Sequence, residues 1–306
     1  MEYHPLVSII IPNYNHCQFL EERIKSILNQ TYTNYEIIIL DDNSSDHSLE
    51  IINKFKENPH IVNIVINEKN SGKPCRQWRK GIQMANGDLI WIAESDDSCS
   101  PFFLERLIPI HCSNHVVLTF CRSQRFDEKG HMSFTFNFEF KDGIWDGHEF
   151  IDKYLGRRCV IANASSVIFS KKCFQNIPED YLNLEGSNDW LFWIELCRQG
   201  KIAFSGEALN YFRYHQSNTT IKNGQNGIND FADKQIIDYL FSQSLIKKST
   251  YKQLIRYRLI DLSSRKFESE TIRKELIKVW GGYSVSYKIK NFISKVLVKL
   301  EYMIWE

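Results

Sequence analysis

Apolar and polar positions along the first hundred residues follow two periodicities in turn. Four short apolar runs have the length of buried strands, and they lie at 7–11, 35–40, 61–66 and 88–93. Between the runs, apolar residues recur at helical spacing, which predicts helices over 18–29, around Leu49 to Phe55, and over 75–85. Strands that alternate with helices predict an α/β fold, a mostly parallel sheet with crossover helices on its faces.

The pattern becomes less regular after residue 100. Ser100-Pro101 has the residue types of an N-cap and a first helical position, so we expect a helix through Ile108. Further strands are expected at 116–120 and, from alternating phenylalanines, over 132–140. Two more apolar runs lie at 160–169 and 202–214, on either side of a helix that begins near Asn188.

Beyond about Asn226 the pattern is helical and rich in Lys, Ile and Leu. We therefore expect one α/β domain over 1–225 and a helical C-terminal extension over 226–306. Apolar residues within 283–306 recur at helical spacing, with lysines spread between them. Such a helix could lie on an anionic membrane surface. Docking on the rest of the chain, or on a second copy in a homodimer, is the more common role of an amphipathic helix.

Composition excludes several classes of protein. The 306 residues carry a formal net charge of +1, which argues against a nucleic-acid-binding protein, because such proteins have a clear cationic excess. The eight cysteines contain no C-x-x-C pair, so neither a structural zinc site nor a disulfide framework is expected. The apolar stretch at 6–11 ends at Pro12, and no run reaches the roughly 20 apolar residues of a membrane span. We expect a cytoplasmic protein.

Acidic residues stand where the expected strands end. Asp41-Asp42 follows the second strand, Glu94-Ser95-Asp96-Asp97 follows the fourth, and Asp189 lies at the start of a later helix. In open α/β sheets ligands bind outside the carboxyl ends of the strands, so these side chains should converge on one crevice.

The first strand ends in Pro12-Asn13-Tyr14-Asn15, which excludes the glycine-rich phosphate loops of dinucleotide-binding and P-loop proteins. A bound diphosphate would therefore need another source of positive charge. Mg²⁺ or Mn²⁺ held by the carboxylates at 94–97 would supply it, because hard oxygen ligands select these ions.

The ordered blocks resemble an inverting family-two glycosyltransferase with the GT-A fold, which binds nucleotide-diphospho-sugars. The resemblance spans about residues 5–215, and it rests on VSIIIPNYN (7–15), SILNQTYTNYEIIILDDNSSD (26–46), N-x-G (70–72), ANGDLIWIAESDD (85–97) and NDW (188–190). It implies transfer of a sugar, with a UDP-sugar as the expected donor, to a saccharide or lipid-linked saccharide acceptor in polysaccharide or glycolipid assembly.

The resemblance also assigns roles to residues. For the nucleotide it implies stacking of the base on Tyr14, a bond from the base imide to Asp42, and a ribose contact at Asp96; the full nucleotide-binding set is Pro12, Tyr14, Asn15, Asp42, Lys73 and Asp96. Lys73 is favoured over Arg76 and Arg79 as the cation that faces the diphosphate. Asp97 and His215 are expected to bind Mn²⁺ or Mg²⁺, and Asp189 is expected to be the catalytic base.

Simpler interpretations remain open for each of these residues. Asp42 and Asp189 could only cap a turn and a helix, and His215 could be structural, as lone histidines usually are. Two other functions also share the crevice. A nucleotidylyltransferase would need a glycine-rich basic loop after the first strand, and a non-catalytic nucleotide-sugar sensor would have no use for a base at Asp189.

Overall fold

The computed structural model describes residues 4–136, 140–215 and 223–281. The chain divides into two compact units. The larger consists of Met1–Ile151, Arg158–Asn183 and Asp189–His215, and the smaller of Asp152–Arg157, Leu184–Asn188 and Gln216–Glu306. The larger unit thus ends at His215 rather than at residue 225, and the smaller one includes two short segments from within the expected first domain.

Four parallel strands form the first half of the central sheet. They are β1 (Val7–Asn13), β2 (Tyr35–Asp41), β3 (Ile61–Ile66) and β4 (Leu89–Ile92), in the spatial order β3-β2-β1-β4. β1 pairs with β2 and with β4, and β2 pairs with β3. The four strands lie where the apolar runs predict them, and the expected α/β fold is confirmed.

The second half of the sheet is mixed. Its strands are β5 (Ser98–Cys99), β6 (Leu118–Asp127), β7 (Met132–Thr135), β8 (Gly143–Asp146), β9 (Val167–Ser170) and β10 (Lys201–Tyr214). β9 runs antiparallel to both β4 and β6, whereas β10 runs parallel to β6 and antiparallel to β5 and β8. The parallel arrangement expected from the sequence therefore holds for β1 to β4 and for the β6–β10 pair.

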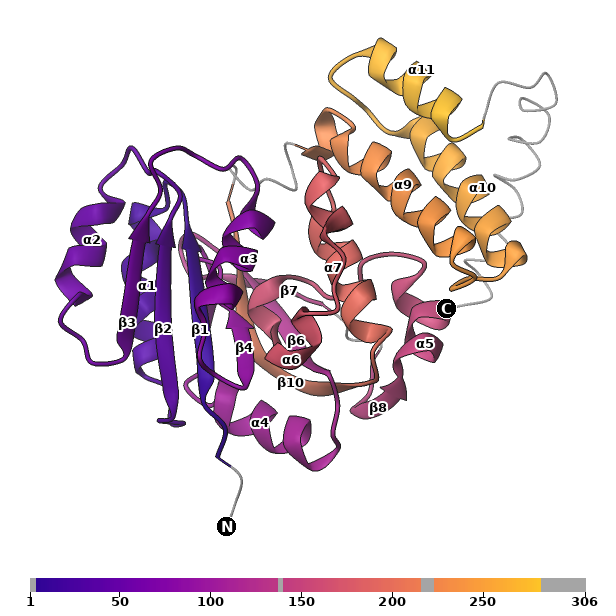
Figure 1. Ribbon diagram of the computed structural model, residues 1–306. Coiled ribbons are helices and arrows are strands. Elements are labelled where there is room, and N and C mark those ends of the chain that lie inside the picture. Colours follow the sequence, from indigo (N-terminus) through magenta and orange to yellow (C-terminus); the bar gives the residue numbers. More distant parts are fainter. Residues whose placement is uncertain (1–3, 137–139, 216–222, 282–306) are drawn as a thin grey trace. The chain divides into compact units, whose positions relative to one another are not determined.

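Helices cover both faces of the parallel strands (Figure 1). Those of the larger unit are α1 (Cys17–Leu28), α2 (Ser48–Phe55), α3 (Pro74–Met84), α4 (Phe103–Ser113), α5 (Gly147–Phe150), α6 (Lys171–Phe174) and α7 (Asn188–Cys197). Ile9 and Ile37 pack with Leu20 and Ile24 of α1 in one apolar cluster. On the opposite face, α3 approaches β1 at Gly81, where an added Cβ would lie 2.4 Å from Ile10. Burial on both faces explains why the strands read as continuous apolar runs.

Three expected elements differ from the structure. α4 begins at Phe103, because Ser100 and Pro101 form a turn in which the Ser100 Oγ accepts from the Phe102 backbone N–H at 3.3 Å. The apolar run at 160–169 is a strand only from Val167, since Ala164–Ser166 form a 3₁₀ turn. The strand expected over 132–140 is observed as β7, and its residues 137–139 lie outside the described part of the chain.

Three helices make up most of the described C-terminal region, residues 223–281, as the sequence predicts. They are α9 (Ile228–Ser242), α10 (Lys248–Ser264) and α11 (Glu270–Val279). The buried carboxylate of Asp230 accepts hydrogen bonds from Arg258, at 3.1 Å, and from Arg265, and its backbone carbonyl accepts from the Trp280 indole at 3.2 Å. Asp230 therefore links α9 to α10 and to the end of α11. The expected membrane or docking helix at 283–306 lies outside the described residues.

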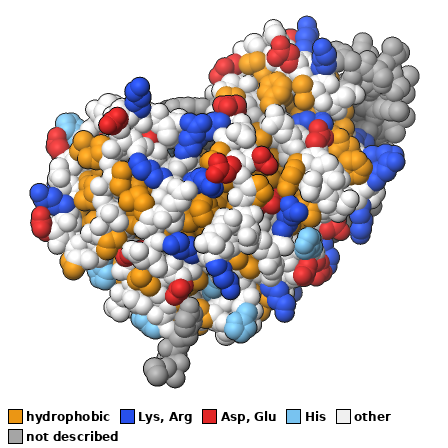
Figure 2. Space-filling view, viewed as in Figure 1, with side chains coloured by type: hydrophobic (Ala, Val, Ile, Leu, Met, Phe, Trp, Pro, Cys, Tyr) orange, Lys and Arg blue, Asp and Glu red, His pale blue; other side chains and the backbone are white. Residues whose placement is uncertain are grey.

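Charged side chains of both signs are interspersed on the surface. Figure 2 shows Lys and Arg beside Asp and Glu on the face it draws, in keeping with the net charge of +1. Glu21, for example, pairs with Lys25 at 2.7 Å and with Lys54 at 3.0 Å. Water and salt screen exposed pairs of this kind, so the fold depends on its core rather than on them. No helix among the described residues is both long and apolar enough to cross a bilayer.

Replacement of Gly87 tests how closely β1 and β4 are joined. A Cβ at this position would lie 2.6 Å from the Leu6 carbonyl oxygen and 2.7 Å from the Ser8 backbone nitrogen, and neither atom can move without disturbing β1. We expect Gly87→Ala to lower the free energy of unfolding by about 1–3 kcal/mol, the usual cost of overpacking. Gly224→Ala is the control, since nothing lies within 4 Å of its Cβ. Equal urea midpoints for the two variants would contradict this account.

Candidate functional site

The side chain of Asp41 joins the carboxyl ends of β1 and β2. Its fully buried carboxylate accepts hydrogen bonds from the Asn13 Nδ2 at 2.7 Å and from the backbone N and the Oγ of Ser44 at 2.8 and 2.7 Å. Ser44 Oγ also accepts from the backbone N–H of Asn15, at 2.9 Å. Asp41 therefore has a structural role: it fixes the two loops from which the predicted nucleotide contacts project.

Asp42, the residue expected to bind the base, is held in place from several sides. Its nearly buried carboxylate accepts from the Asn67 Nδ2 at 2.6 Å and the Gln77 Nε2 at 2.8 Å. Ser71 donates to it through its backbone N–H, at 2.9 and 3.0 Å from the two oxygens, and through its hydroxyl, at 2.7 Å. The N-x-G loop at 70–72 thus covers Asp42 in this structure.

The end of β1 places three predicted residues differently. Pro12 is buried within the strand, whereas Tyr14 is 47% exposed. Asn15 has a positive φ of 55°, a conformation that Asn tolerates better than most residues, and its Oδ1 accepts from the Ser45 backbone N–H at 2.7 Å. Tyr14 therefore has an accessible ring, and Asn15 shapes the loop.

Lys73, Arg76 and Arg79, the three candidate cations near α3, have different partners in the structure. Lys73 Nζ donates to the Leu182 carbonyl at 3.1 Å, and Arg76 Nη1 donates to the Ser71 carbonyl at 2.9 Å. Arg79 instead pairs with Glu179 and lies over the Phe174 ring. Arg76 therefore bonds to the loop that covers Asp42, the Lys73 ammonium is directed to the 179–183 turn, and Arg79 is directed to Glu179.

The carboxylate of Asp97 accepts hydrogen bonds from other residues of the chain. This carboxylate is 1% exposed, and it accepts from the Asn163 side chain, from the Ser165 Oγ at 2.6 Å and from the Arg213 backbone N–H at 3.0 Å. Burial and the neighbouring charge of Asp96 raise the pKa of Asp97 to about 7. Asp97 therefore ties the end of β4 to the 163–165 turn and to β10.

Glu94 lies in the same acidic loop as Asp97, three residues before it. Its Oε1 accepts from the Trp78 indole N–H at 2.8 Å, and its backbone N–H donates to the Ser165 Oγ at 3.0 Å. Burial, with the charges of Asp96 and Asp97, raises the pKa of Glu94 to about 8. At neutral pH the protonated form of Glu94 predominates, which reduces the concentration of negative charge at the end of β4.

Asp96 faces two histidines. His215 Nε2 lies 3.0 Å from an Asp96 carboxylate oxygen, and the ligand atoms of His16, Asp96 and His215 all lie within 4.8 Å of one another. Burial opposes ionisation of Asp96, but the hydrogen bond with His215 and the electrostatic interactions with the two imidazoles outweigh it, so the pKa of Asp96 is lowered. Asp96 is thus the ionised carboxylate of the group.

Two imidazoles and one carboxylate form a donor set that fits a divalent cation. The ligand atoms of all three side chains lie within 4.8 Å of one another, so the three residues could hold one such ion together. Carboxylate oxygen suits Mg²⁺ and Mn²⁺, and imidazole nitrogen suits transition metals. Asp97, which the sequence suggested as a metal ligand, lies outside this group.

Arg213 of β10 holds the acidic loop in position. Its Nε donates to the Asp96 carbonyl at 2.8 Å, its backbone N–H donates to Asp97, and its Nη2 donates to Glu22 at 2.6 Å. The guanidinium is buried and lies 4.2 Å from the ring centre of Phe126. One residue therefore sets the positions of Asp96 and Asp97 together.

Asp189 occupies the first turn of α7 and is partly buried. Burial raises the pKa of its carboxyl, against the opposing effect of hydrogen bonds from the Trp190 backbone N–H and from its own. Burial also raises the pKa of the Cys75 thiol well above its ordinary value, and the charges of Asp189 and Glu94 add to this, while Lys73 opposes it. Asp189, Glu94 and Lys73 therefore lie close enough to act on the same thiol.

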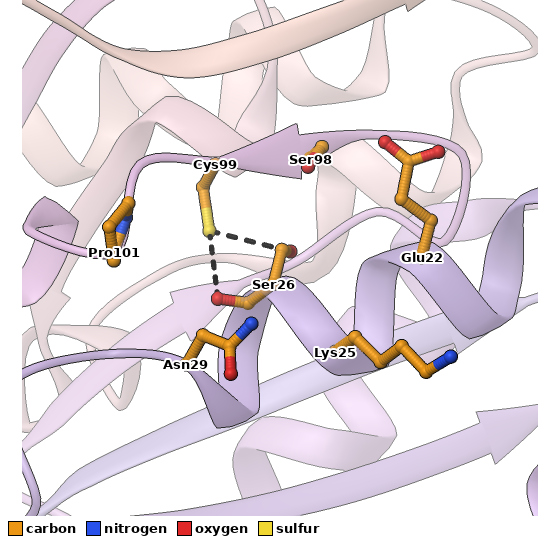
Figure 3. Close-up of a pocket in the computed structure, with 7 residues that line it drawn as sticks. All are labelled: Glu22, Lys25, Ser26, Asn29, Ser98, Cys99 and Pro101. Atoms are coloured by element: carbon orange, nitrogen blue, oxygen red, sulfur yellow. Dashed lines mark hydrogen bonds between the residues drawn. The ribbon is translucent and has the colours of Figure 1, made fainter.

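A separate pocket of about 260 Å³ lies between α1 and β5 (Figure 3). It is lined by Glu22, Lys25, Ser26, Asn29, Ser98, Cys99 and Pro101. Cys99 Sγ is 3.6 Å from the Ser26 Oγ and 3.7 Å from the Ser26 carbonyl. None of the residues expected to bind nucleotide or metal lines this pocket. Ser98 of its lining directly follows the acidic loop, and Glu22 accepts a hydrogen bond from Arg213.

Reasoning from the sequence missed the contributions of His16 and Arg213. His16 directly follows the PNYN block at the end of the first strand, so its place next to a loop expected at the crevice was the available signal. Arg213 lies between Tyr211 and His215 in a segment already matched to relatives. Its contact with the acidic loop depends on the pairing of β10 with β5, which the sequence does not reveal.

Removal of the Arg213 guanidinium tests its role as a support. We expect Arg213→Met to lower the free energy of unfolding by about 1.5–3 kcal/mol, because the Asp96 carbonyl and Glu22 lose a charged donor. Arg106→Met is the control, since Arg106 is exposed and its nearest carboxylate, Glu207, is 3.7 Å away. Urea unfolding followed by circular dichroism measures both. If Arg213→Met had wild-type stability, the acidic loop at 94–97 would not depend on the Arg213 guanidinium for its position.

Comparison with known families gives one match over more than half of the chain. The family described as "Glycosyl transferase family 2" matches residues 8–176. The matched region includes the ends of β1, β2 and β4, with Tyr14, Asp42 and the acidic loop at 94–97.

Two of the most similar relatives are named as glycosyltransferases, without a stated donor or acceptor. An uncharacterized glycosyltransferase of Haemophilus influenzae is 39% identical over 115 residues, which are 38% of this chain and 46% of that protein. A second uncharacterized glycosyltransferase of that organism is 28% identical over 228 residues, 72% of this chain and 69% of that protein. The chain thus spans less than half of the first relative.

Solved structures share the fold at low sequence identity. S. aureus TarS in complex with UDP-GlcNAc has a TM-score of 0.57 and 15% identity, over 93% of this chain and 75% of that one. The mannosyltransferase PcManGT from Pyrobaculum calidifontis, in complex with GDP-Man and Mn²⁺, has a TM-score of 0.59 and 13% identity, over 99% and 84%. Both show the same fold as this chain.

Proposed function

Because the chain belongs to glycosyl transferase family 2, we propose that it moves a sugar from a nucleotide-diphospho-sugar to an acceptor hydroxyl with inversion at the anomeric carbon. The observation that carries the proposal is the placement of Asp42, Asp96 and His215 after the carboxyl ends of β2, β4 and β10, with His215 Nε2 3.0 Å from the Asp96 carboxylate. The strand β1 separates β2 from β4 in the sheet, which leaves its end, with Tyr14, between the two carboxylates. A nucleotide laid across this edge would meet all of them.

Asp42 and Tyr14 are the proposed contacts to the base. Asn67 and Gln77 hold the Asp42 carboxylate from within, and an imide N–H of uracil would take the place of the Ser71 donors. The ring of Tyr14 is exposed and could stack on the base. UDP-sugars are the favoured donors, and the UDP-GlcNAc bound to the TarS neighbour supports this class of ligand.

Asp96 and His215 are the residues that would hold Mn²⁺ or Mg²⁺. Their 3.0 Å spacing fits such an ion, and the engagement of Asp97 by Asn163 and Ser165 favours Asp96 over Asp97 for this role. When bound, the ion would neutralise charge that develops on the departing diphosphate. The Mn²⁺ in the complex of the PcManGT neighbour supports a divalent cation.

Asp189 is the proposed catalytic base. The acceptor oxygen attacks the anomeric carbon as its proton passes to the Asp189 carboxylate, the bond from that carbon to the diphosphate oxygen breaks, and the nucleoside diphosphate leaves. A single displacement inverts the anomeric configuration. The raised pKa of Asp189 suits a base, since it brings the proton affinity of the carboxylate closer to that of the group it deprotonates.

The acceptor is proposed to be a saccharide or a lipid-linked saccharide in polysaccharide or glycolipid assembly in the cytoplasm. Glycosyltransferase family membership supports this setting. Peripheral membrane contact or homodimer formation through 283–306 remains a proposal from the sequence, because these residues lie outside the described part of the chain.

A screen of nucleotide sugars with the full chain and Mn²⁺ tests the activity and the base together. We expect release of nucleoside diphosphate from one donor class, slow with water as acceptor. With that donor, Asp189→Asn should keep binding but lower turnover at least about 10²-fold, because the acceptor proton has no base to receive it. Asp180→Asn is the matched control, since Asp180 is exposed in the larger unit.

Three outcomes would contradict this assignment. Release of pyrophosphate would indicate a nucleotidylyltransferase. Tight donor binding without release under any acceptor condition would indicate a sensor. Unchanged turnover of Asp189→Asn would remove Asp189 from the reaction while leaving the transferase intact.

Replacement of Asp96 and of Asp97 by Asn, one at a time, distinguishes the roles of the two neighbouring aspartates. Asp96→Asn should weaken Mn²⁺ binding, because it removes the ionised carboxylate of the group, and should change stability little. Asp97→Asn should lower the unfolding midpoint, because one of the two accepting oxygens becomes an amide NH₂ that faces hydrogen-bond donors, either Asn163 and Ser165 or the Arg213 backbone N–H. Mn²⁺ titration and thermal unfolding measure the two effects. Weaker Mn²⁺ binding in Asp97→Asn, with a lower unfolding midpoint in Asp96→Asn, would indicate that Asp97 is the metal ligand instead.

A further inference from the structure

We propose that His16 is a third protein ligand of the metal ion, and that the resulting His16–Asp96–His215 set binds Mn²⁺ in strong preference to Mg²⁺. This inference rests on the proposed function, since it concerns the ion that Asp96 and His215 would hold. The juxtaposition that carries it is a histidine from the end of β1 beside the acidic loop after β4 and the end of β10.

The position of His16 is not explained by helix capping. It occupies the N-cap position of α1, where Ser, Thr, Asp or Asn normally accept a hydrogen bond from the first turn, but its side chain makes no such bond. The Asp46 carboxylate accepts from the Cys17 backbone N–H, at 2.9 Å, and so satisfies one of the free donors of α1. The imidazole is thus available for another role.

The turn at Asn15 directs His16 toward the acidic loop. Asn15 has a positive φ of 55°, and the Ser44 and Ser45 contacts hold it in that conformation. The His16 Nδ1 then lies 2.9 Å from the Ser95 Oγ. The residue next to Asp96 therefore orients the ring, as an oxygen partner commonly does for a metal-binding imidazole. In the tautomer with its proton on Nδ1, the ring would donate to Ser95 and leave the Nε2 lone pair for a metal ion.

The three side chains converge from separate elements. The ligand atoms lie within 4.8 Å of one another, and the His16 and His215 rings are nearly perpendicular, at 83°, with centres 5.7 Å apart. His215 Nε2 and Asp96 already have the spacing of two neighbouring ligands.

This donor set is poor for Mg²⁺. Mg²⁺ prefers oxygen ligands and dehydrates reluctantly, whereas imidazole nitrogens suit transition-metal ions. Asp96 would be the only carboxylate, because Asp97 is engaged with Asn163, Ser165 and Arg213. A site with two nitrogens and one oxygen from the protein should therefore discriminate between the two ions more sharply than a site built from carboxylates.

Binding of Mn²⁺ alone to the full chain provides the test. Free Mn²⁺ is measured by electron paramagnetic resonance, and pulsed methods count the imidazole nitrogens coupled to the bound ion. We expect two coupled imidazoles in the wild type and one in His16→Ala or His16→Gln. Since loss of even an outer-shell partner costs about 10–100-fold in affinity, loss of His16 should weaken Mn²⁺ binding at least about 10-fold. Mg²⁺ affinity should change less, so the preference for Mn²⁺ narrows.

His148→Ala is the control, because His148 is exposed and its ring is absent from the metal-binding group. His16→Gln keeps a polar partner for Ser95 and guards against loss of folding in His16→Ala, and circular dichroism checks both. Two coupled nitrogens and wild-type Mn²⁺ affinity in both variants would overturn the inference. Failure of the proposed function looks different: the wild type would show no imidazole coupling at all, or would release no nucleoside diphosphate from any donor. A single coupled imidazole in an active wild type would overturn only the role of His16.

Discussion

Three carboxyl groups within four residues, Glu94, Asp96 and Asp97, lie partly or fully buried at the end of β4, and the rest of the site depends on how their charge is compensated. Burial of unpaired carboxylates is costly, so such a cluster persists only with partners. Each of the three carboxyl groups has a different hydrogen-bond partner. Glu94 accepts a hydrogen bond from the Trp78 indole and its pKa is raised to about 8, Asp97 is surrounded by hydrogen-bond donors, and Asp96, whose pKa is lowered, lies beside His215.

The compensating groups explain why distant segments meet at this place. Arg213 contributes from β10, and the fully buried Arg23 contributes from α1, where it lies over Trp91. Burial raises the pKa of Glu94 and of Asp97, and the positive charge of Arg23 offsets part of that rise. The 3₁₀ turn at Ala164–Ser166 interrupts an apolar run so that Ser165 can reach the same loop. The mixed second half of the sheet therefore supports the acidic loop, and the parallel first half presents Asp42 and Tyr14 beside it.

The sequence predicts those parts of the fold that depend on local pattern. The runs at β1 to β4 and the helices α1 to α3 follow from apolar spacing, and the blocks around Asp42 and Asp96 follow from resemblance to a family. The division of labour between Asp96 and Asp97 could not be predicted, because adjacent residues in a loop face opposite directions that only the surrounding strands determine. His16 was missed for a similar reason. A single histidine has no pattern, and its meeting with Asp96 depends on the backbone turn at Asn15 and on the adjacent placement of β1 and β4.

A crystal of the full chain grown with UDP and Mn²⁺ would test the central claim most directly, because anomalous scattering locates the manganese independently of the protein density. The account predicts a single strong peak within ligand distance of Asp96 and His215, with the diphosphate against it and the uracil between Tyr14 and Asp42 in place of Ser71. Manganese bound to Asp97 instead, or UDP seated in the pocket between α1 and β5 lined by Ser26 and Cys99, would contradict it.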